Sequence, residues 1–266
     1  MSTDESFEFN EEFDILCQSG KKASTELLKI VEEGFDKSFK ANDDPVTTGD
    51  FTVNNILQEE FSKHFPEIGW LSEETRDNKN RLDKELVWIV DPIDGTKEFV
   101  MSIPEYSISV ALVRNGSPIM GLILNPLRDE MYTAIKGKGA FLNEKPIQVK
   151  DTLDEKPTIV ASRSEIKRGE FEPFENVSKI VPTGSIAYKL ALVAAGKADG
   201  TFSLGPKNEW DIAAGCLIVE EAGGKVSDKY GQGFKFNQKD TLVNSIVGTS
   251  KIASEQIYSM IQKEMN

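Results

Sequence analysis

The sequence predicts an α/β or a layered α+β protein, because helical and strand-like patterns mix along the whole chain. Apolar residues recur at helical spacing in residues 49–65, whereas residues 86–91 form a continuous apolar run that ends in an aspartate. Two further apolar runs, 106–113 and 118–124, flank Asn115-Gly116, and this dipeptide is a strong β-hairpin signal.

In the N-terminal half, helices are expected before strands. Asp50 stands at the start of the second helix, directly after Gly49. A buried strand follows, and the hairpin signal then predicts an antiparallel meander. The expected ranges are helices at 13–35 and 49–65, and strands at 86–91, 106–113, 118–124 and 130–135.

A polar segment that ends in a proline, residues 151–157, predicts the boundary between two joined lobes, residues 1–152 and residues 153–266. Gly223-Gly224 is typical of a helix C-cap. Residues 1–10 are expected to fray. The ranges expected in the second lobe are strands at 158–161 and 243–247, and helices at 185–195, 211–222 and 252–261.

Composition excludes several classes of function. The 266 residues include 31 Lys and Arg against 44 Asp and Glu, which gives a net charge of −13. This excess of acids argues against a surface that binds a nucleic-acid polymer. With one histidine, His64, and two distant cysteines, the chain cannot build a histidine-rich zinc site. Chemistry based on carboxylates, hydroxyl groups and oxygen-liganded metals is therefore expected.

A cytoplasmic location without membrane contact is also expected. No stretch approaches the ~20 apolar residues that span a bilayer, and the acidic first residues lack the features of a signal peptide. Cys17 and Cys216 do not suggest a disulfide framework, so we expect them to pack in the core, as we do His64.

The most informative acids are Asp91 and Asp94, which follow the predicted strand at 86–91. Pro92 directs the chain into a turn and Gly95 permits tight backbone geometry, so two carboxylates and the start of a helix at Thr96 would face one cavity. Like charges at ~3–5 Å need compensation, and oxygen ligands favour Mg²⁺, Mn²⁺ or Ca²⁺. A helix N-terminus suits a phosphate. Taken alone, the same string is also compatible with a surface turn.

Three other acidic positions stand apart from ordinary surface charge. Asp50 opens the second helix, and Glu73-Glu74 follows an apolar dipeptide, although a solvated loop would also explain this pair. Asp211 follows Trp210 and opens a helix of small residues, where a simple N-cap is the alternative.

Together these motifs resemble the inositol monophosphatase superfamily of Mg²⁺-dependent, lithium-sensitive phosphatases. The resemblance rests on the string from Trp88 to Phe99 (WIVDPIDGTKEF) and on WDIAA from Trp210, followed by EAGG that ends at Gly224. The strings LSEE, ending at Glu74, and DPVTTGD, ending at Asp50, add to it. It covers roughly residues 13 to 260 and implies a layered αβαβα sandwich of the inositol monophosphatase and fructose-1,6-bisphosphatase type.

Within that superfamily the chain looks most similar to bacterial 3′(2′),5′-bisphosphate nucleotidases of sulfate assimilation. Lys97-Glu98-Phe99 follows the DGT string, and Gly205-Pro206 opens a string similar to the nucleotidase GPxNxWD. Leu204 stands where animal inositol monophosphatases carry a glutamate. However, Gly184-Ser185 has the register of the inositol monophosphatases, which leaves the substrate open.

The resemblance also implies roles for single residues. Thr96, held by Asp50, would orient or deprotonate the attacking water with help from Glu73. Two or three Mg²⁺ ions would be bound by the side chains of Glu73, Asp91, Asp94 and Asp211 and by the backbone carbonyl of Ile93. The substrate would be contacted by Asp94, Gly95, Thr96, Gly184, Ser185, Lys189 and Asp211, although Lys189 could equally be solvated.

The expected activity is removal of the 3′-phosphate from 3′-phosphoadenosine 5′-phosphate to give AMP. Inositol 1-phosphate, histidinol phosphate or another small phosphomonoester is the alternative substrate. A catalytically silent metal-binding regulator is a remote alternative, and the complete set of acids argues against it. The resemblance further implies a possible homodimer.

Overall fold

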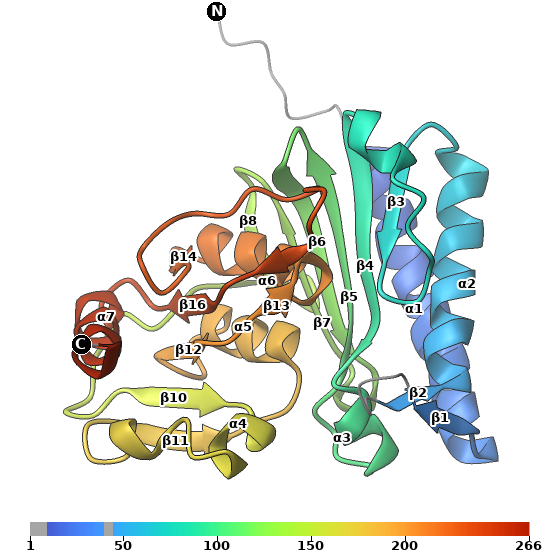
Figure 1. Cartoon of the computed structure of the whole chain (residues 1–266). Coiled ribbons are helices and arrows are strands. Elements are labelled where there is room, and N and C mark those ends of the chain that lie inside the picture. The colour runs from blue at the N-terminus through green and yellow to red at the C-terminus, as the bar shows by residue number, and fades with distance from the viewer. Residues whose placement is uncertain (1–9, 40–44, 266) are drawn as a thin grey trace, which may run out of the picture.

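The computed structural model describes residues 10–39 and 45–265 and shows five layers, as the resemblance implies (Figure 1). Helices α1 (Asn10–Glu33) and α2 (Thr48–His64) form one outer layer. A seven-stranded sheet follows, then α5 (Ile186–Ala194) and α6 (Glu209–Glu221), then a five-stranded sheet. Helix α7 (Ser254–Met265) lies on the far side of the second sheet. The αβαβα prediction is confirmed.

The seven-stranded sheet follows the chain order of its strands. Only β3 and β4 are parallel, and all other neighbours are antiparallel. The strands are β3 (Gly69–Ser72), β4 (Leu86–Asp94), β5 (Ser107–Arg114), β6 (Ser117–Asn125), β7 (Glu130–Ile135), β8 (Gly139–Leu142) and β9 (Lys145–Ile147).

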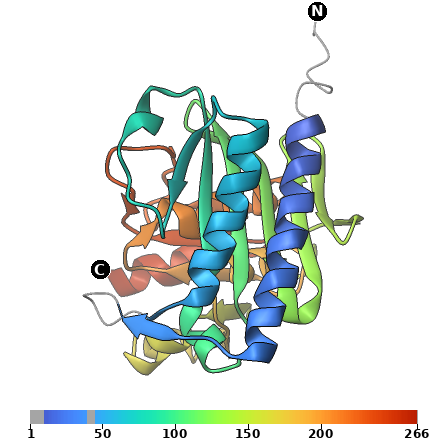
Figure 2. The same cartoon turned by 90° about the vertical axis from the view of Figure 1, so that its right-hand side faces the viewer.

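Both faces of this sheet are buried, which explains why its strands are almost continuously apolar. Along β4, Trp88 and Val90 point to the face that α1 and α2 cover, and Val87 and Ile89 point to the face that α5 and α6 cover. Figure 2 shows α1 and α2 side by side across the first face. The sheet therefore forms a rigid base, and the ends of its strands can position functional groups.

The five-stranded sheet is mixed. Strand β10 is parallel to both of its neighbours, and β16 is antiparallel to both of its own. Its outer face packs on Ile257 and Ile261 of α7 and on Phe171 and Phe174. In spatial order the strands are β11 (Lys179–Pro182), β10 (Thr158–Ala161), β12 (Gly200–Ser203), β16 (Ile246–Thr249) and β14 (Lys225–Ser227).

The remaining elements are short. They are β1 (Lys37–Phe39) paired with β2 (Pro45–Thr47), β13 (Lys207–Asn208) paired with β15 (Leu242–Val243), α3 (Thr96–Val100), α4 (Arg163–Lys167), and the 3₁₀ turns η2 (Asn80–Asp83), η3 (Pro126–Arg128) and η4 (Glu172–Phe174). Helix α1 begins at Asn10, and the expected fraying of residues 1–9 lies outside the described residues. Asp44 of the DPVTTGD string also lies outside them.

Two expected elements need correction. The predicted strand at 243–247 is two strands, β15 and β16, which belong to different sheets. Strand β4 does not end at Asp91 but continues to Asp94 through a change in register. The division at residue 152 stays a prediction. No helix in the described ranges is long and apolar enough to cross a bilayer.

Candidate active site

A cavity of about 590 Å³ lies where the ends of β3 and β4 meet the first residues of α3, α5 and α6. Such a volume suits a small ligand. Most of the residues expected to act on substrate or metal line it: Glu73, Asp91, Ile93, Asp94, Gly95, Thr96, Ser185, Lys189 and Asp211. Asp50 and Gly184 lie behind this lining.

The end of β4 is shaped by a bulge between Asp91 and Asp94, where the register against β5 shifts. Asp91, only 2% exposed, accepts a hydrogen bond from the Ile93 N–H at 3.1 Å, which fixes its carboxylate. Gly95 then adopts a φ of 95°, a conformation that favours glycine. A bulge re-aims side chains at the end of a strand, and here it turns both aspartates to one cavity.

Asp94 is held by the first residues of α5. Its Oδ2 atom accepts hydrogen bonds of 2.6 Å from both the Ser185 hydroxyl and the Ala187 N–H. Ser185 has a φ of 56°, outside the usual range for a residue with a side chain. Gly184 donates its N–H to Glu105, and a Cβ atom at residue 184 would meet the Glu105 carbonyl at 2.6 Å. Only glycine therefore fits at this position.

Asp50 and Asp211 serve the same local purpose in two different helices. Each is the third residue of its helix and completes a capping box, Asp50 with Thr47 and Asp211 with Asn208. The Thr47 N–H donates to Asp50 at 2.7 Å, and the Asn208 N–H donates to Asp211 at 2.8 Å. The N-cap interpretation of Asp211 is therefore wrong, because Asn208 is the cap.

Asp50 reaches the cavity through Thr96. The Thr96 hydroxyl lies 3.3 Å from Asp50 Oδ1 and 3.0 Å from the Ile93 carbonyl oxygen. A hydroxyl has one proton to donate, so its lone pairs remain able to accept one from a water molecule in the cavity.

The three aspartates of the cavity each use one carboxylate oxygen to hold the fold. Among the described residues, nothing donates a hydrogen bond to the second oxygen of Asp91, Asp94 or Asp211. Burial, and then the charges of neighbouring acids, holds the pKa of Asp91 and of Asp211 well above the usual range. Burial also raises the pKa of Asp94 to about 6, although bonds from Ser185 and Ala187 oppose this. When these acids ionise together, a nearby cation is needed to offset their negative charge.

Comparison with known proteins gives matches over nearly the whole chain. The model of the family described as "Inositol monophosphatase family" matches residues 10–266. The chain is also 34% identical over 264 residues to an inositol-1-monophosphatase of Mesorhizobium japonicum, covering 95% of this chain and 96% of that one.

The chain belongs to the inositol monophosphatase family. It is 33% identical over 230 residues to the Nus factor SuhB of Pasteurella multocida, with 82% of this chain and 85% of that protein covered. The crystal structure of the extragenic suppressor protein suhB of Bartonella henselae superposes with a TM-score of 0.84 at 31% identity, over 96% of this chain and 99% of that one. Inositol monophosphatases are Mg²⁺-dependent phosphatases, so the fit to Mg²⁺ can be tested on this chain.

The donor atoms fit Mg²⁺ in their chemistry. They are carboxylate and carbonyl oxygens, the ligands that this hard cation prefers, and three carboxylates have an oxygen without a hydrogen bond. In the part of the chain that the structure describes, no three acidic, histidine or cysteine side chains are grouped so that they could hold a metal ion as placed. The fit to Mg²⁺ therefore rests on the chemistry of the donor atoms and on their buried negative charge. The carboxylate groups would have to rotate in order to bind one ion together.

Basic residues also line the cavity. They are Lys97, Arg163, Lys167, Lys189 and Lys207. The lining contains five acidic and five basic side chains, whereas the whole chain has a net charge of −13. Lys207 forms an ion pair with the buried Glu165 at 3.1 Å. Lys189 is itself buried, and this burial lowers its pKa. Lys189 is 2% exposed and donates no hydrogen bond to any described residue. The side chain is therefore available to an anionic ligand.

Sequence patterns did not indicate Arg163 and Lys167, which lie on the short helix α4. Their one local signal is position: Ser162-Arg163-Ser164 directly follows β10, at the carboxyl end of a strand. Ligands of α/β proteins commonly bind at such ends.

Stability should respond to Mg²⁺ more strongly at high pH. The folded pKa of Asp94, about 6, lies above its usual value of 3.8, so stability from this group is present below pH 3.8 and is lost as the pH rises through about 6. Mg²⁺ bound to the ionised carboxylates would offset this loss. We expect about 10 mM Mg²⁺ to raise Tm by several degrees at about pH 8 and much less at about pH 5. Calorimetry in EDTA and in Mg²⁺ checks this, and an equal rise at both pH values would contradict it.

Proposed function

We propose that the chain hydrolyses 3′-phosphoadenosine 5′-phosphate to AMP and inorganic phosphate in a Mg²⁺-dependent reaction. A water oxygen attacks the 3′-phosphorus, the bond between phosphorus and the 3′-oxygen breaks, and the leaving oxygen takes a proton. The observation that carries the proposal is the presence of five acidic and five basic side chains in the lining of one cavity. A cation held by the acids suits the reacting phosphate, and the basic side chains suit a second anionic group.

Two or three Mg²⁺ ions would be held by Glu73, Asp91, Asp94 and Asp211 and by the Ile93 carbonyl. When bound, they supply Lewis acidity: they neutralise charge on the phosphoryl group and lower the pKa of water.

The protein's own groups would orient the reactants. The Thr96 hydroxyl, held near Asp50 Oδ1, would accept a hydrogen bond from the attacking water and aim its oxygen at phosphorus. Glu73 lines the same cavity and would assist. The N–H groups of Gly95 and Thr96 would donate to the phosphate oxygens. These groups position and polarise the substrate, so no covalent intermediate with the enzyme is needed.

Lys189 would bind the 5′-phosphate. Its ammonium group is desolvated, and hydrogen bonds between charged groups are stronger than neutral ones. Lys207, which is tied to Glu165, and the exposed Lys167 would add to the positive field. A substrate with a single phosphate would leave Lys189 without a phosphate to bind.

Inositol 1-phosphate is the second candidate substrate. It is favoured by the register of Gly184-Ser185 and by the similarity to a relative named inositol-1-monophosphatase. Because Ser185 donates a hydrogen bond to Asp94 and Gly184 donates one to Glu105, their register bears on the Asp94 carboxylate as well as on the substrate.

A panel of phosphate esters tests the proposal. Phosphate release is measured at equal concentrations of 3′-phosphoadenosine 5′-phosphate, inositol 1-phosphate, histidinol phosphate and 3′-AMP, with Mg²⁺ or with EDTA. We expect kcat/KM for the bisphosphate to exceed that for 3′-AMP by about 10- to 100-fold, the value of one charged hydrogen bond or ion pair. A preference for the inositol ester would overturn the substrate assignment, and a lack of any Mg²⁺-dependent hydrolysis would favour a silent regulator.

A further inference from the structure

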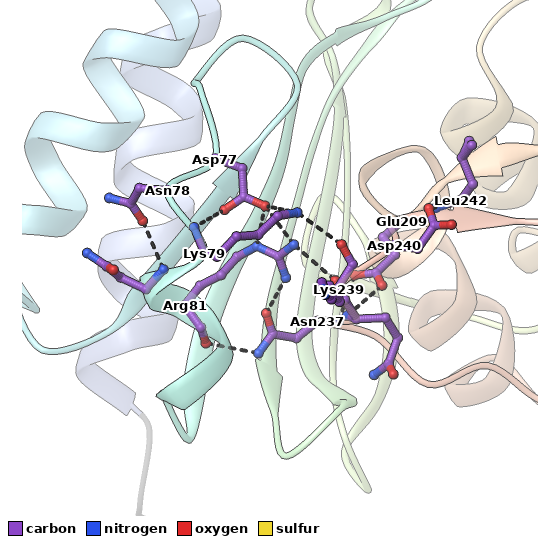
Figure 3. A network of polar contacts seen from close by, with 11 residues as sticks. Asp77, Asn78, Lys79, Arg81, Glu209, Asn237, Lys239, Asp240 and Leu242 are labelled. Carbon is purple, nitrogen blue, oxygen red and sulfur yellow. Dashed lines mark hydrogen bonds and ion pairs between the residues drawn. The ribbon is translucent and has the colours of Figure 1, made fainter.

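A buried arginine joins the loop between β3 and β4 to a segment far along the chain (Figure 3). The Arg81 side chain is 1% exposed. Its Nε and Nη2 atoms donate to Asp77 Oδ2 at 3.1 and 2.8 Å. Its Nη1 atom donates to Asn237 Oδ1 at 2.6 Å, and Nη2 also donates to the Gln238 carbonyl at 3.0 Å. One guanidinium group thus binds two segments that are 156 residues apart.

The contact is reciprocal. The Asn237 side chain donates back to the Arg81 carbonyl at 3.1 Å. On the other side of the same loop, the Lys79 ammonium group binds Asp77 at 2.8 Å and the Lys239 carbonyl at 2.9 Å. Residues 77–81 and 237–239 therefore form a clasp of side-chain and backbone bonds, in which each segment fixes the other.

The clasp extends to the first residue of α6. The carboxylate of Glu209, only 1% exposed, accepts the N–H groups of Asn237 at 2.6 Å and of Gln238 at 2.8 Å. The Glu209 N–H donates to the Thr241 carbonyl at 2.8 Å. Arg81 orders residues 237–238, and these residues in turn hold Glu209.

The two ends of the clasp lead to two acids that line the cavity, Glu73 and Asp211. Glu73 stands at the start of the loop that contains Asp77 and Arg81, and its N–H donates to the Val90 carbonyl at 3.2 Å. Asp211 lies two residues after Glu209 on the first turn of α6. Both acids line the cavity, although they belong to segments that no sheet pairing joins directly.

We propose that Arg81 is a positioning residue, which sets the separation of Glu73 and Asp211 through Asp77, Asn237 and Glu209. The inference rests on the proposed function, because it assumes that these two acids bind the same group of metal ions. A hard cation such as Mg²⁺ requires well-placed ligands. Partners behind the ligands commonly change metal affinity by about 10- to 100-fold.

A purely structural role explains these contacts less well. A buried ion pair is weak evidence for stability, since apolar residues of similar size often replace it without loss. The guanidinium group here instead distributes its N–H groups over three acceptors in two segments, which a lysine cannot reproduce. The geometry of the guanidinium group therefore fixes the position of one segment relative to the other.

The test uses the full-length protein with two variants. Arg81→Met combined with Asp77→Asn removes both members of the ion pair, so that neither is left without the other. Asn237→Gly removes the amide that Arg81 binds, and glycine tolerates the φ of 59° found there. Ile257→Ala, on the buried face of α7 and not among the residues that line the cavity, is the control for a loss of stability alone. Circular dichroism identifies conditions in which each variant is folded.

Two readouts are independent of turnover. We expect the Mn²⁺ affinity, measured by electron paramagnetic resonance, to fall at least ~10-fold in both clasp variants and to change by less than about twofold in Ile257→Ala. We also expect hydrogen exchange at residues 208–213, without metal, to be faster only in the clasp variants. Arg81→Lys should give an intermediate Mn²⁺ affinity.

The outcomes separate this inference from the proposed function. If the unmodified protein binds Mn²⁺ and the clasp variants bind it equally well, the positioning role is wrong and the metal site stands. If the clasp variants and Ile257→Ala lose affinity to the same degree, Arg81 acts only through stability and the inference is overturned. If the unmodified protein binds no Mn²⁺, the proposed function fails. If hydrogen exchange at residues 208–213 is then also unchanged in the clasp variants, the positioning role of the clasp is overturned as well.

Discussion

Replacing Asp94 with asparagine should abolish most of the activity and leave the fold intact. The amide oxygen of asparagine can still accept the hydrogen bonds that Ser185 and Ala187 donate, but one negative charge at the proposed metal ligands is lost. We expect kcat/KM to fall by at least ~10²-fold, the usual cost of removing one electrostatic stabiliser from an active site. Phosphate release at saturating Mg²⁺ measures the effect.

The stability of this variant provides an internal check. Burial raises the pKa of Asp94 to about 6, so the neutral asparagine should not lower Tm in EDTA. Asp228→Asn is the matched control, because Asp228 also accepts two hydrogen bonds on one oxygen, from the N–H groups of Tyr230 and Gln232, in a loop that does not line the cavity. An Asp94→Asn enzyme that kept most of its turnover would contradict the role of this carboxylate.

Replacing Lys189 with methionine should lower activity on the bisphosphate selectively. Methionine fills the buried space but cannot donate to an anion. We expect kcat/KM for 3′-phosphoadenosine 5′-phosphate to fall by about 10- to 100-fold, as the loss of a hydrogen bond between charged groups implies. Activity on 3′-AMP should change by less than about threefold, because that substrate has no 5′-phosphate to bind.

The ratio between the two substrates is decisive, because the charge of Lys189 also acts on Asp94. An equal loss with both substrates would show that Lys189 acts through this carboxylate and not on a second phosphate. Lys197→Met is the control. Lys197 follows α5 but binds Glu130 at 2.7 Å and does not line the cavity.

Patterns within single segments predicted much of the fold. The strands at 106–113, 118–124 and 130–135 agree with β5, β6 and β7 to within one residue, because a sheet buried on both faces requires long apolar runs. Strands β8, β9 and β12 were missed, since runs of three or four residues contain too little periodicity. The five layers followed from the family resemblance and not from these segments.

The acids of the cavity could be predicted because they lie in short motifs at the ends of strands and helices. The roles of Asp50 and Asp211 in capping boxes could not, because the cap depends on which neighbouring N–H each carboxylate reaches. The presence of Arg163 and Lys167 at the cavity and the Arg81 clasp depend on tertiary contacts between distant segments, such as the pairing of Arg81 with Asn237. Nothing in the local sequence of either segment indicates its partner.

The carboxylates of this cavity are proposed to bind a divalent cation. Anomalous diffraction from crystals of the unmodified protein and of Asp94→Asn, both soaked in Mn²⁺, tests this. We expect Mn²⁺ peaks between Asp91, Asp94 and Asp211 in the unmodified protein, and weaker or missing peaks in the variant. Mn²⁺ bound elsewhere with none in this cavity, in crystals of an enzyme that hydrolyses phosphate esters, would contradict it.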